Sequence, residues 1–187
     1  MNIEPLTDDR LPDLADLFGS NSTTNHCYCM YFLLTGRDFD AGAAGANRER
    51  FEVFAARAEP PAGLLAYRDG QPVGWCAIGP RARYPKVLRS PLWKGRDSAE
   101  DESVWLVPCF FVRRTARRSG VVRALLAAAV ELASKHGAPA IEGFPRSGAD
   151  RVDPASAYVG AEPVFASLGF TPTRRPNERR VVMRREL

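Results

Sequence analysis

The sequence predicts an α/β (α+β) fold: a mixed central β-sheet of six to seven strands flanked by helices. The main observation is a strand, a helix and a second strand in succession over residues 104–112, 119–136 and 140–144. The two strands are apolar runs, and the helix repeats apolar residues every three to four positions. Strands joined by such a helix pair in parallel, whereas short turns elsewhere give antiparallel pairs. Both kinds of pairing in one sheet make it mixed.

The first sixty residues predict one strand and two helices, separated by small or polar segments. In order these are a strand over 2–6, a helix capped by Thr7 with an apolar face from Leu11 to Phe18, a loop over 19–25, an apolar run of ambiguous periodicity over 27–34, a mobile Gly/Ala-rich segment over 36–46, and a helix from Asn47 that ends before Pro60.

A hairpin follows, because Asp69-Gly70 separates two apolar runs and this dipeptide favours a tight turn. Residues 80–101 mix prolines with charged residues and predict a long connection, a type of segment that carries function or is disordered. The remaining elements expected are strands over 63–67 and 72–78, a helix over 162–168, and final strands over 170–174 and 180–184. We expect one domain over residues 1–187.

Composition excludes several classes of protein. The longest apolar stretches are far too short to span a bilayer, and the N-terminus lacks the basic start and apolar run of a signal peptide. A cytoplasmic protein with free thiols is therefore expected. The run His26-Cys27-Tyr28-Cys29 hints at a metal, but the chain has only two histidines and no second paired cluster. We expect no metal site.

Positive charge is concentrated in two places, although the formal net charge is only +4. Clustered arginine indicates a phosphorylated cofactor, a nucleic acid or a solvated basic face. One cluster comprises Arg113, Arg114, Arg117, Arg118 and Arg123, and the other Arg174, Arg175, Arg179, Arg180, Arg184 and Arg185.

The first cluster lies where the strand over 104–112 passes through a short loop into the helix over 119–136. A helix N-terminus has unpaired backbone N–H groups and a partial positive charge, so it binds anions. Gly120 leaves the backbone open to a phosphate. The pattern predicts a phosphate site on the amides and side chains of Arg117, Arg118, Ser119, Gly120, Val121, Val122 and Arg123.

The run Arg117-Arg118-Ser119-Gly120-Val121 resembles the Arg/Gln-x-x-Gly-x-Gly/Ala signature of the GNAT superfamily of N-acetyltransferases. Val122 departs from it, because the signature has Gly or Ala there. The strand expected over 140–144 and the run from Phe165 to Phe170 also resemble the family. The Cys-Tyr-Cys-Met-Tyr run and Tyr158-Val159-Gly160 resemble, less specifically, an uncharacterised bacterial branch of it. The resemblance covers residues 63–187 well and residues 1–60 loosely.

The resemblance implies the GNAT fold, acetyl-CoA as co-substrate, and pyrophosphate binding at the arginine loop. It also implies a bulged central strand that splays from its neighbour. Pro108 fits such a bulge because proline cannot donate a hydrogen bond to a β-ladder; the alternative explanation of Pro108 is an edge strand, which tolerates proline. Backbone groups of Phe110, Phe111 and Val112 would then bind the acetyl carbonyl and the pantetheine arm. Homodimers are common among such proteins and are expected weakly here.

The implied reaction is direct attack of a primary amine on the thioester in a ternary complex. Glu142 is the first candidate base, with an ion pair to an arginine as the alternative; Asp101 and Glu102 are weaker candidates. Phe165 occupies the position of the tyrosine that usually acts as the general acid. Tyr158 is the candidate substitute for this acid; the alternative is that Tyr158 is a buried ring that only packs. Cys109 is a candidate nucleophile or, as the alternative, a buried apolar residue.

Two other functions compete with the acetyltransferase. One is a catalytically silent acyl-CoA-binding sensor, because Val122 and Phe165 depart from the family pattern. The other is a basic RNA-binding protein, although no recognition motif supports it. The acceptor amine stays unidentified, and five aromatic residues are candidate walls for its pocket: Tyr28, Tyr31, Trp75, Tyr84 and Trp93.

Overall fold

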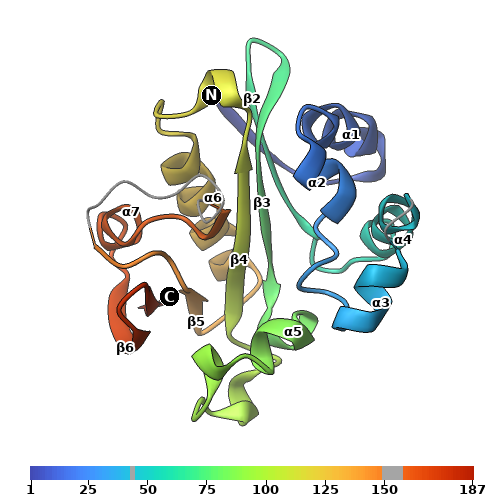
Figure 1. Cartoon of the computed structure of the whole chain (residues 1–187). Helices are drawn as coiled ribbons and strands as arrows, with labels where there is room; N and C mark the ends of the chain where they lie inside the picture. Colours follow the sequence, from blue (N-terminus) through green and yellow to red (C-terminus); the bar gives the residue numbers. More distant parts are fainter. Residues whose placement is uncertain (43–44, 149–157) are drawn as a thin grey trace.

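A mixed seven-stranded sheet forms the centre of the computed structural model, which describes residues 1–42, 45–148 and 158–187 (Figure 1). The strand order is β1-β2-β3-β4-β5-β7-β6. Only β4 and β5 pair in parallel among these neighbours; the other pairs are antiparallel, as the sequence predicted. The strands are β1 (Asn2–Pro5), β2 (Gly63–Arg68), β3 (Gln71–Pro80), β4 (Trp105–Val112), β5 (Ala140–Gly143), β6 (Thr171–Asn177) and β7 (Arg180–Glu186).

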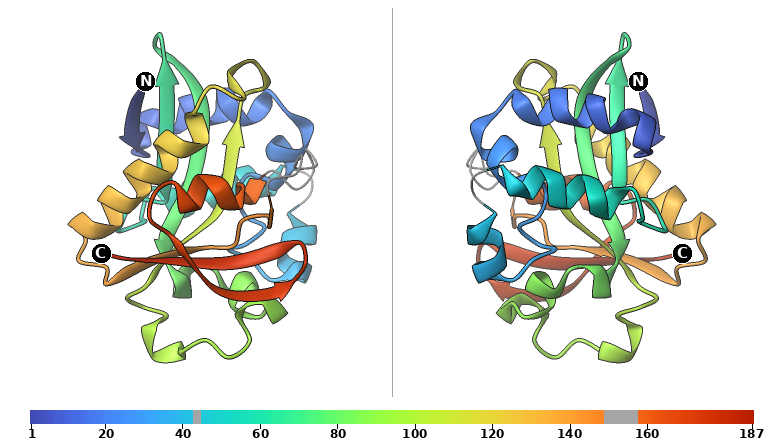
Figure 2. Two further views of the ribbon diagram at one scale, coloured as in Figure 1. Left: turned by 90° about the vertical axis from the view of Figure 1, so that its left-hand side faces the viewer. Right: turned by 90° about the vertical axis from the view of Figure 1, so that its right-hand side faces the viewer.

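Helices cover both faces of the sheet, as Figures 1 and 2 show. The longest, α6 (Val121–Lys135), packs on one face together with α7 (Glu162–Ala166). The other face carries α1 (Leu11–Gly19), α2 (Ser22–Cys27), α3 (Gly36–Ala41) and α4 (Ala46–Ala55), and α5 (Pro85–Leu88) follows β3. No helix in the described part of the chain is long and apolar enough to cross a membrane.

Helix α6 is positioned by its apolar stripe and by a glycine beneath it. Val121 and Leu125 are buried against the sheet. A Cβ at Gly74 in β3 would lie 2.6 Å from Val121 Cγ1, so only glycine lets the first turn of α6 approach this closely. The start of α6, and with it the arginine loop, is therefore fixed close to β3.

Strand β4 is bulged and splays from β5, as predicted. Ala77 pairs with Cys109 and Gly79 with Leu106, so three steps along β4 oppose two along β3. Parallel pairing with β5 ends at Val107, immediately before Pro108. Strand β4 continues to Val112 without β5 beside it, which opens the sheet along this half of the strand.

The sequence missed two short helices on the N-terminal side. Helix α2 begins within the predicted 19–25 loop and extends to Cys27, because the Asn21 side chain accepts from the amides of Thr23 and Thr24. Helix α3 forms within the Gly/Ala-rich segment, where Thr35 caps the first turn. Side-chain capping thus produces helices in segments whose composition alone favoured loops.

Candidate active site

The loop between β4 and α6 presents a row of unpaired backbone donors. A 3₁₀ turn over Arg114–Ala116 leads to Arg118 and Gly120, whose φ angles of 61° and 81° lie in the left-handed region. Within the described parts of the chain, the amide N–H groups of residues 118–123 have no hydrogen-bond acceptor. These groups converge where the dipole of α6 is positive, so the loop suits a diphosphate.

The space in front of these amides is open. A Cβ built at Gly120 would meet no atom within 4 Å, so nothing in the described structure covers the backbone there. Arg68, at the end of β2, donates from Nη2 to Ser119 Oγ at 2.9 Å and adds a cation that the sequence did not reveal. The residues therefore fit the pyrophosphate of an acyl-CoA: free amides, an open approach and surrounding arginines.

Two of the loop arginines have structural partners. Arg113 forms an ion pair with Asp16 at 2.7 Å, which ties the loop to α1. Arg117 donates from Nε to the carbonyl of Val112 at 3.3 Å. Arg114, Arg117, Arg118 and Arg123 are all exposed. The exposed arginines are therefore the ones that can meet the phosphates of a ligand.

Backbone groups of β4 face the opening left by β5. The amide of Arg113 donates to Val73 in β3 at 2.9 Å, so by strand alternation Phe110 and Val112 direct their polar groups to the other edge. Pairing with β5 has already ended there. Phe111 lies between them, and its side chain packs on the face of α1. Phe110 and Val112 therefore offer the hydrogen-bonding edge that a pantetheine arm needs.

Tyr158 lies beside this opening. Its ring centroid is 6.2 Å from that of Phe32, and the Arg180 guanidinium carbon lies 6.0 Å from its centroid. Burial raises the pKa of Tyr158, partly offset by Arg180, with smaller contributions from Tyr31 and Cys109. The phenol is 37% exposed and keeps its proton at neutral pH, as a general acid must.

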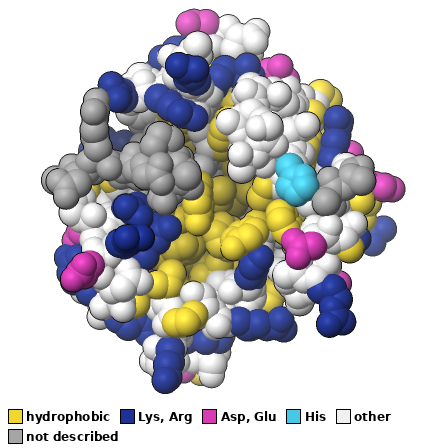
Figure 3. All heavy atoms as spheres, viewed as in Figure 1, with side chains coloured by type: hydrophobic (Ala, Val, Ile, Leu, Met, Phe, Trp, Pro, Cys, Tyr) yellow, Lys and Arg dark blue, Asp and Glu magenta, His cyan; other side chains and the backbone are white. Residues whose placement is uncertain are grey.

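Apolar side chains gather in a hollow in the middle of this face, with lysine and arginine side chains on its rim (Figure 3). Four of the five aromatic residues expected to wall an acceptor pocket do not reach it, because Tyr28, Trp75, Tyr84 and Trp93 are fully buried in the cores. Tyr31 is 41% exposed, and Lys86 Nζ lies 3.5 Å from its ring centroid. Tyr31 is the member of the five that can contact a ligand.

Phe165 takes no part in proton transfer. It is fully buried, packs edge-on against Phe110 and Phe170, and fills the space that a Cβ at Gly143 would need. Its ring supports β4 and β5 where they separate.

Glu142 is engaged by two arginines. Its Oε2 accepts from Arg81 Nη1 at 3.1 Å and its Oε1 from Arg184 Nη1 at 3.3 Å. Arg81 is 2% exposed and also pairs with Asp101 and Glu100, so it anchors the 80–101 connection to β5. Of the two roles considered for Glu142, base or ion-pair partner, this geometry favours the second.

Cys109 is half-buried and lies beside the buried thiol of Cys29. Cys29 accepts a hydrogen bond from Trp75 Nε1 at 3.0 Å. The pKa of Cys29 is lowered, chiefly by a hydrogen bond from Cys109 and then by Trp75, whereas the same bond and burial raise the pKa of Cys109 well above its usual value. Cys109 thus keeps its proton, which makes it a poor nucleophile. No group of three or more His, Cys, Asp or Glu residues in the described structure could hold a metal ion.

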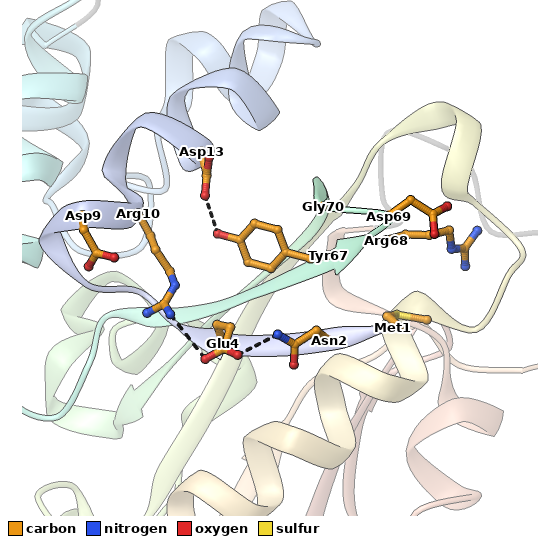
Figure 4. A pocket seen from close by; sticks show the side chains of 10 residues that line it. All are labelled: Met1, Asn2, Glu4, Asp9, Arg10, Asp13, Tyr67, Arg68, Asp69 and Gly70. Carbon is orange, nitrogen blue, oxygen red and sulfur yellow. Dashed lines mark hydrogen bonds and ion pairs between the residues drawn. The ribbon is translucent and has the colours of Figure 1, made fainter.

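A second hollow lies away from the splay, at the outer edge of the sheet (Figure 4). Its groups satisfy one another: Tyr67 donates to Asp13 at 2.7 Å, and Arg10 pairs with Glu4 at 3.5 Å. These contacts join β1 and β2 to α1, and we assign them a structural role.

A mixed sheet with a splayed central strand and an amide-lined helix start defines an acyl-CoA-dependent transferase. The model of the acetyltransferase (GNAT) family matches residues 28–147, more than half of the chain, and the protein belongs to this family. The family assignment makes the protein an acetyltransferase. No curated protein matches the sequence significantly.

Solved structures share the fold at low sequence identity. One is a ribosomal-protein-alanine N-acetyltransferase from Brucella melitensis, with 19% identity, a TM-score of 0.57 and full coverage of both chains. The paia N-acetyltransferase from Thermoplasma acidophilum, in complex with coenzyme A, has 10% identity and a TM-score of 0.56 over 100% of this chain and 98% of that one. The yncA protein from Salmonella typhimurium, with its cofactor acetyl-CoA, has 14% identity and a TM-score of 0.60, covering 100% and 93% of the two chains.

Sequence reasoning missed the residues that reach the site from distant segments. Arg68 arrives from a hairpin 51 positions before Ser119, and Phe32 comes from an apolar run of ambiguous periodicity. Neither carries a local pattern that could have revealed its place, because only the packing of α2 and the hairpin brings it there.

Proposed function

We propose that the protein transfers the acetyl group of acetyl-CoA to a primary amine of a small molecule or peptide, by direct attack in a ternary complex. The observation that carries this proposal is the edge of β4 at Phe110 and Val112, which β5 leaves uncovered and which continues into the unpaired amides of residues 118–123. This path joins a place for the thioester to a place for the pyrophosphate.

The amine attacks from the hollow that Figure 3 shows beside β4. An alkylammonium has a pKa of about 10.4, so the small neutral fraction reacts. A backbone N–H on the open edge of β4 stabilises the oxyanion that forms on the acetyl carbonyl. The attacking nitrogen releases its extra proton to water, and the tetrahedral intermediate collapses with loss of the CoA thiolate.

We propose that Tyr158 donates a proton to that thiolate, because its phenol is neutral and partly exposed. We further propose that Glu142 holds Arg81 and Arg184 in place and does not act as the base. Both carboxylate oxygens already accept hydrogen bonds from guanidinium groups.

The test is turnover of acetyl-CoA with a panel of primary amines, followed by release of free CoA thiol. Steady thiol release that requires an amine, with mass spectrometry showing an acetylamide, supports the proposal. Binding of acetyl-CoA without transfer to any amine would indicate instead a silent acyl-CoA-binding module.

The role of Glu142 is tested by Glu142→Gln in the same assay. If Glu142 is an ion-pair partner, the substitution should leave the shape of the pH–rate profile unchanged and lower the melting temperature. If the acidic limb of the profile disappears and the melting temperature holds, Glu142 is the base after all.

A further inference from the structure

The arginines near the C-terminus separate into two groups in the structure. Four of the six have acceptors: Arg174 at the carbonyl of Lys94, Arg175 at Glu162, Arg184 at Glu100 and Glu142, and Arg185 at the carbonyl of Leu168. The side chains of Arg146 and Arg179 donate no hydrogen bond to a described residue, and Arg180, whose polar neighbour is the Tyr158 hydroxyl, has its Nη1 buried without a partner among the described residues. These three arginines therefore differ from a merely solvated basic face.

Arg146 and Arg180 are held side by side. They are direct partners across an antiparallel bridge, which places their side chains on the same face. Like charges in this arrangement repel each other, and Arg180 Nη1 is buried without a partner among the described residues. Burial lowers the pKa of Arg180; Tyr158 partly offsets this effect, and the charge of Arg146 adds to it. An anion between the two guanidinium groups would relieve both costs.

The space for such an anion exists. A surface hollow is lined by Arg146, Arg179 and Arg180 together with Asn177 and Glu178. Arg180 also lies over the ring of Tyr158, whose other neighbour is Phe32. The arginine hollow thus borders Tyr158, the residue proposed as the general acid of acetyl transfer.

We propose that Arg146 and Arg180 form a carboxylate subsite for the acceptor, so that the substrate is an amine that also carries a carboxylate, as an amino acid does. This inference rests on the proposed acetyl transfer to an amine. The carboxylate binds the two guanidinium groups, and the amine points past Tyr158 toward β4. Glu178 in the same lining reduces the local positive charge, which favours a singly charged carboxylate over a phosphate.

The experiment compares acceptors that differ only in the carboxylate: phenylalanine with 2-phenylethylamine, and 4-aminobutanoate with butylamine, with O-phosphoethanolamine as a phosphate arm. We expect kcat/KM to be about ten-fold or more higher for the carboxylated member of at least one pair, since hydrogen bonds to charged groups discriminate by this factor. In Arg180→Gln this ratio falls toward one. The matched control Arg175→Gln, whose arginine pairs with Glu162 outside the hollow, keeps the ratio of the unmodified protein.

A binding measurement makes the inference independent of turnover. Calorimetric titration of the same compounds into the protein saturated with CoA should show tighter binding of the carboxylated member, and Arg180→Gln should abolish the difference. Equal binding within both pairs, or a preference for the phosphate compound, overturns the carboxylate subsite even if acetylation occurs. Carboxylate-dependent binding without acetylation would instead refute the proposed function and leave the subsite standing.

Discussion

Replacing Gly120 with alanine tests the placement of the coenzyme. Gly120 has a φ of 81° and precedes the first turn of α6, and its Cβ would enter open space. The left-handed conformation costs alanine roughly 1–2 kcal/mol, and the stiffer unfolded chain offsets about 0.4–1 kcal/mol of this. We expect a net loss of stability of about 1 kcal/mol, and a fall in melting temperature of roughly 2–4 °C for a chain of this size.

The effect on acetyl-CoA should be larger. The added methyl group stands in front of the amides of residues 118–123, where the pyrophosphate would approach. Loss of one charge-assisted hydrogen bond costs roughly 1.5–3 kcal/mol. The Kd of acetyl-CoA should therefore rise by about 10- to 100-fold, measured by calorimetry on the folded variant.

Gly137 supplies a matched control at the other end of the same helix. It has a φ of 71°, and a Cβ there also meets nothing within 4 Å. Gly137→Ala should lower the melting temperature as much as Gly120→Ala does, yet leave the Kd unchanged. An unchanged Kd in Gly120→Ala, or an equal loss of affinity in both variants, would refute the assignment of the amide row to the pyrophosphate.

Three other expectations follow from the same contacts. Arg81→Met should destabilise the protein by about 3–5 kcal/mol, seen in urea unfolding, because it leaves buried Glu142 with a partner removed; a change below about 1 kcal/mol would contradict the anchoring role. Tyr158→Phe should lower kcat by about 100-fold, which is the lower end for general acids because a thiolate leaves easily. In the unmodified protein the rate should fall above pH 10, where the phenol, whose pKa is raised, loses its proton, and the variant should not show this fall. The same fall at high pH in both proteins would exclude Tyr158 as the acid. Arg184 lowers the pKa of Glu100 from 4.5, so this carboxylate contributes stability above pH 4.5, and the contribution is lost as the pH falls through the folded-state pKa. Glu100→Gln should therefore flatten the acid side of the curve of stability against pH. An equal slope in both proteins would show that the ion pair contributes nothing.

The loop and helix start at which we expect the phosphate could be predicted from the sequence alone. Residues 112–126 contain everything the anion site needs: a strand end, a glycine with a left-handed conformation and an apolar helical stripe that fixes the helix on the sheet. Pro108 likewise predicted the bulge, because proline has no backbone N–H to donate within a β-ladder. Such features are local, so the chain order alone reveals them.

Which side chains contact one another depends on the tertiary fold. Glu142 lies between Arg81 and Arg184, and Arg146 faces Arg180, through contacts that join positions 34 to 61 residues apart. The same packing turned four candidate pocket aromatics into core residues and paired four of the six C-terminal arginines. Composition gives the number of charges and rings, but their partners depend on register and on the way helices cover the sheet, which no short stretch of sequence encodes.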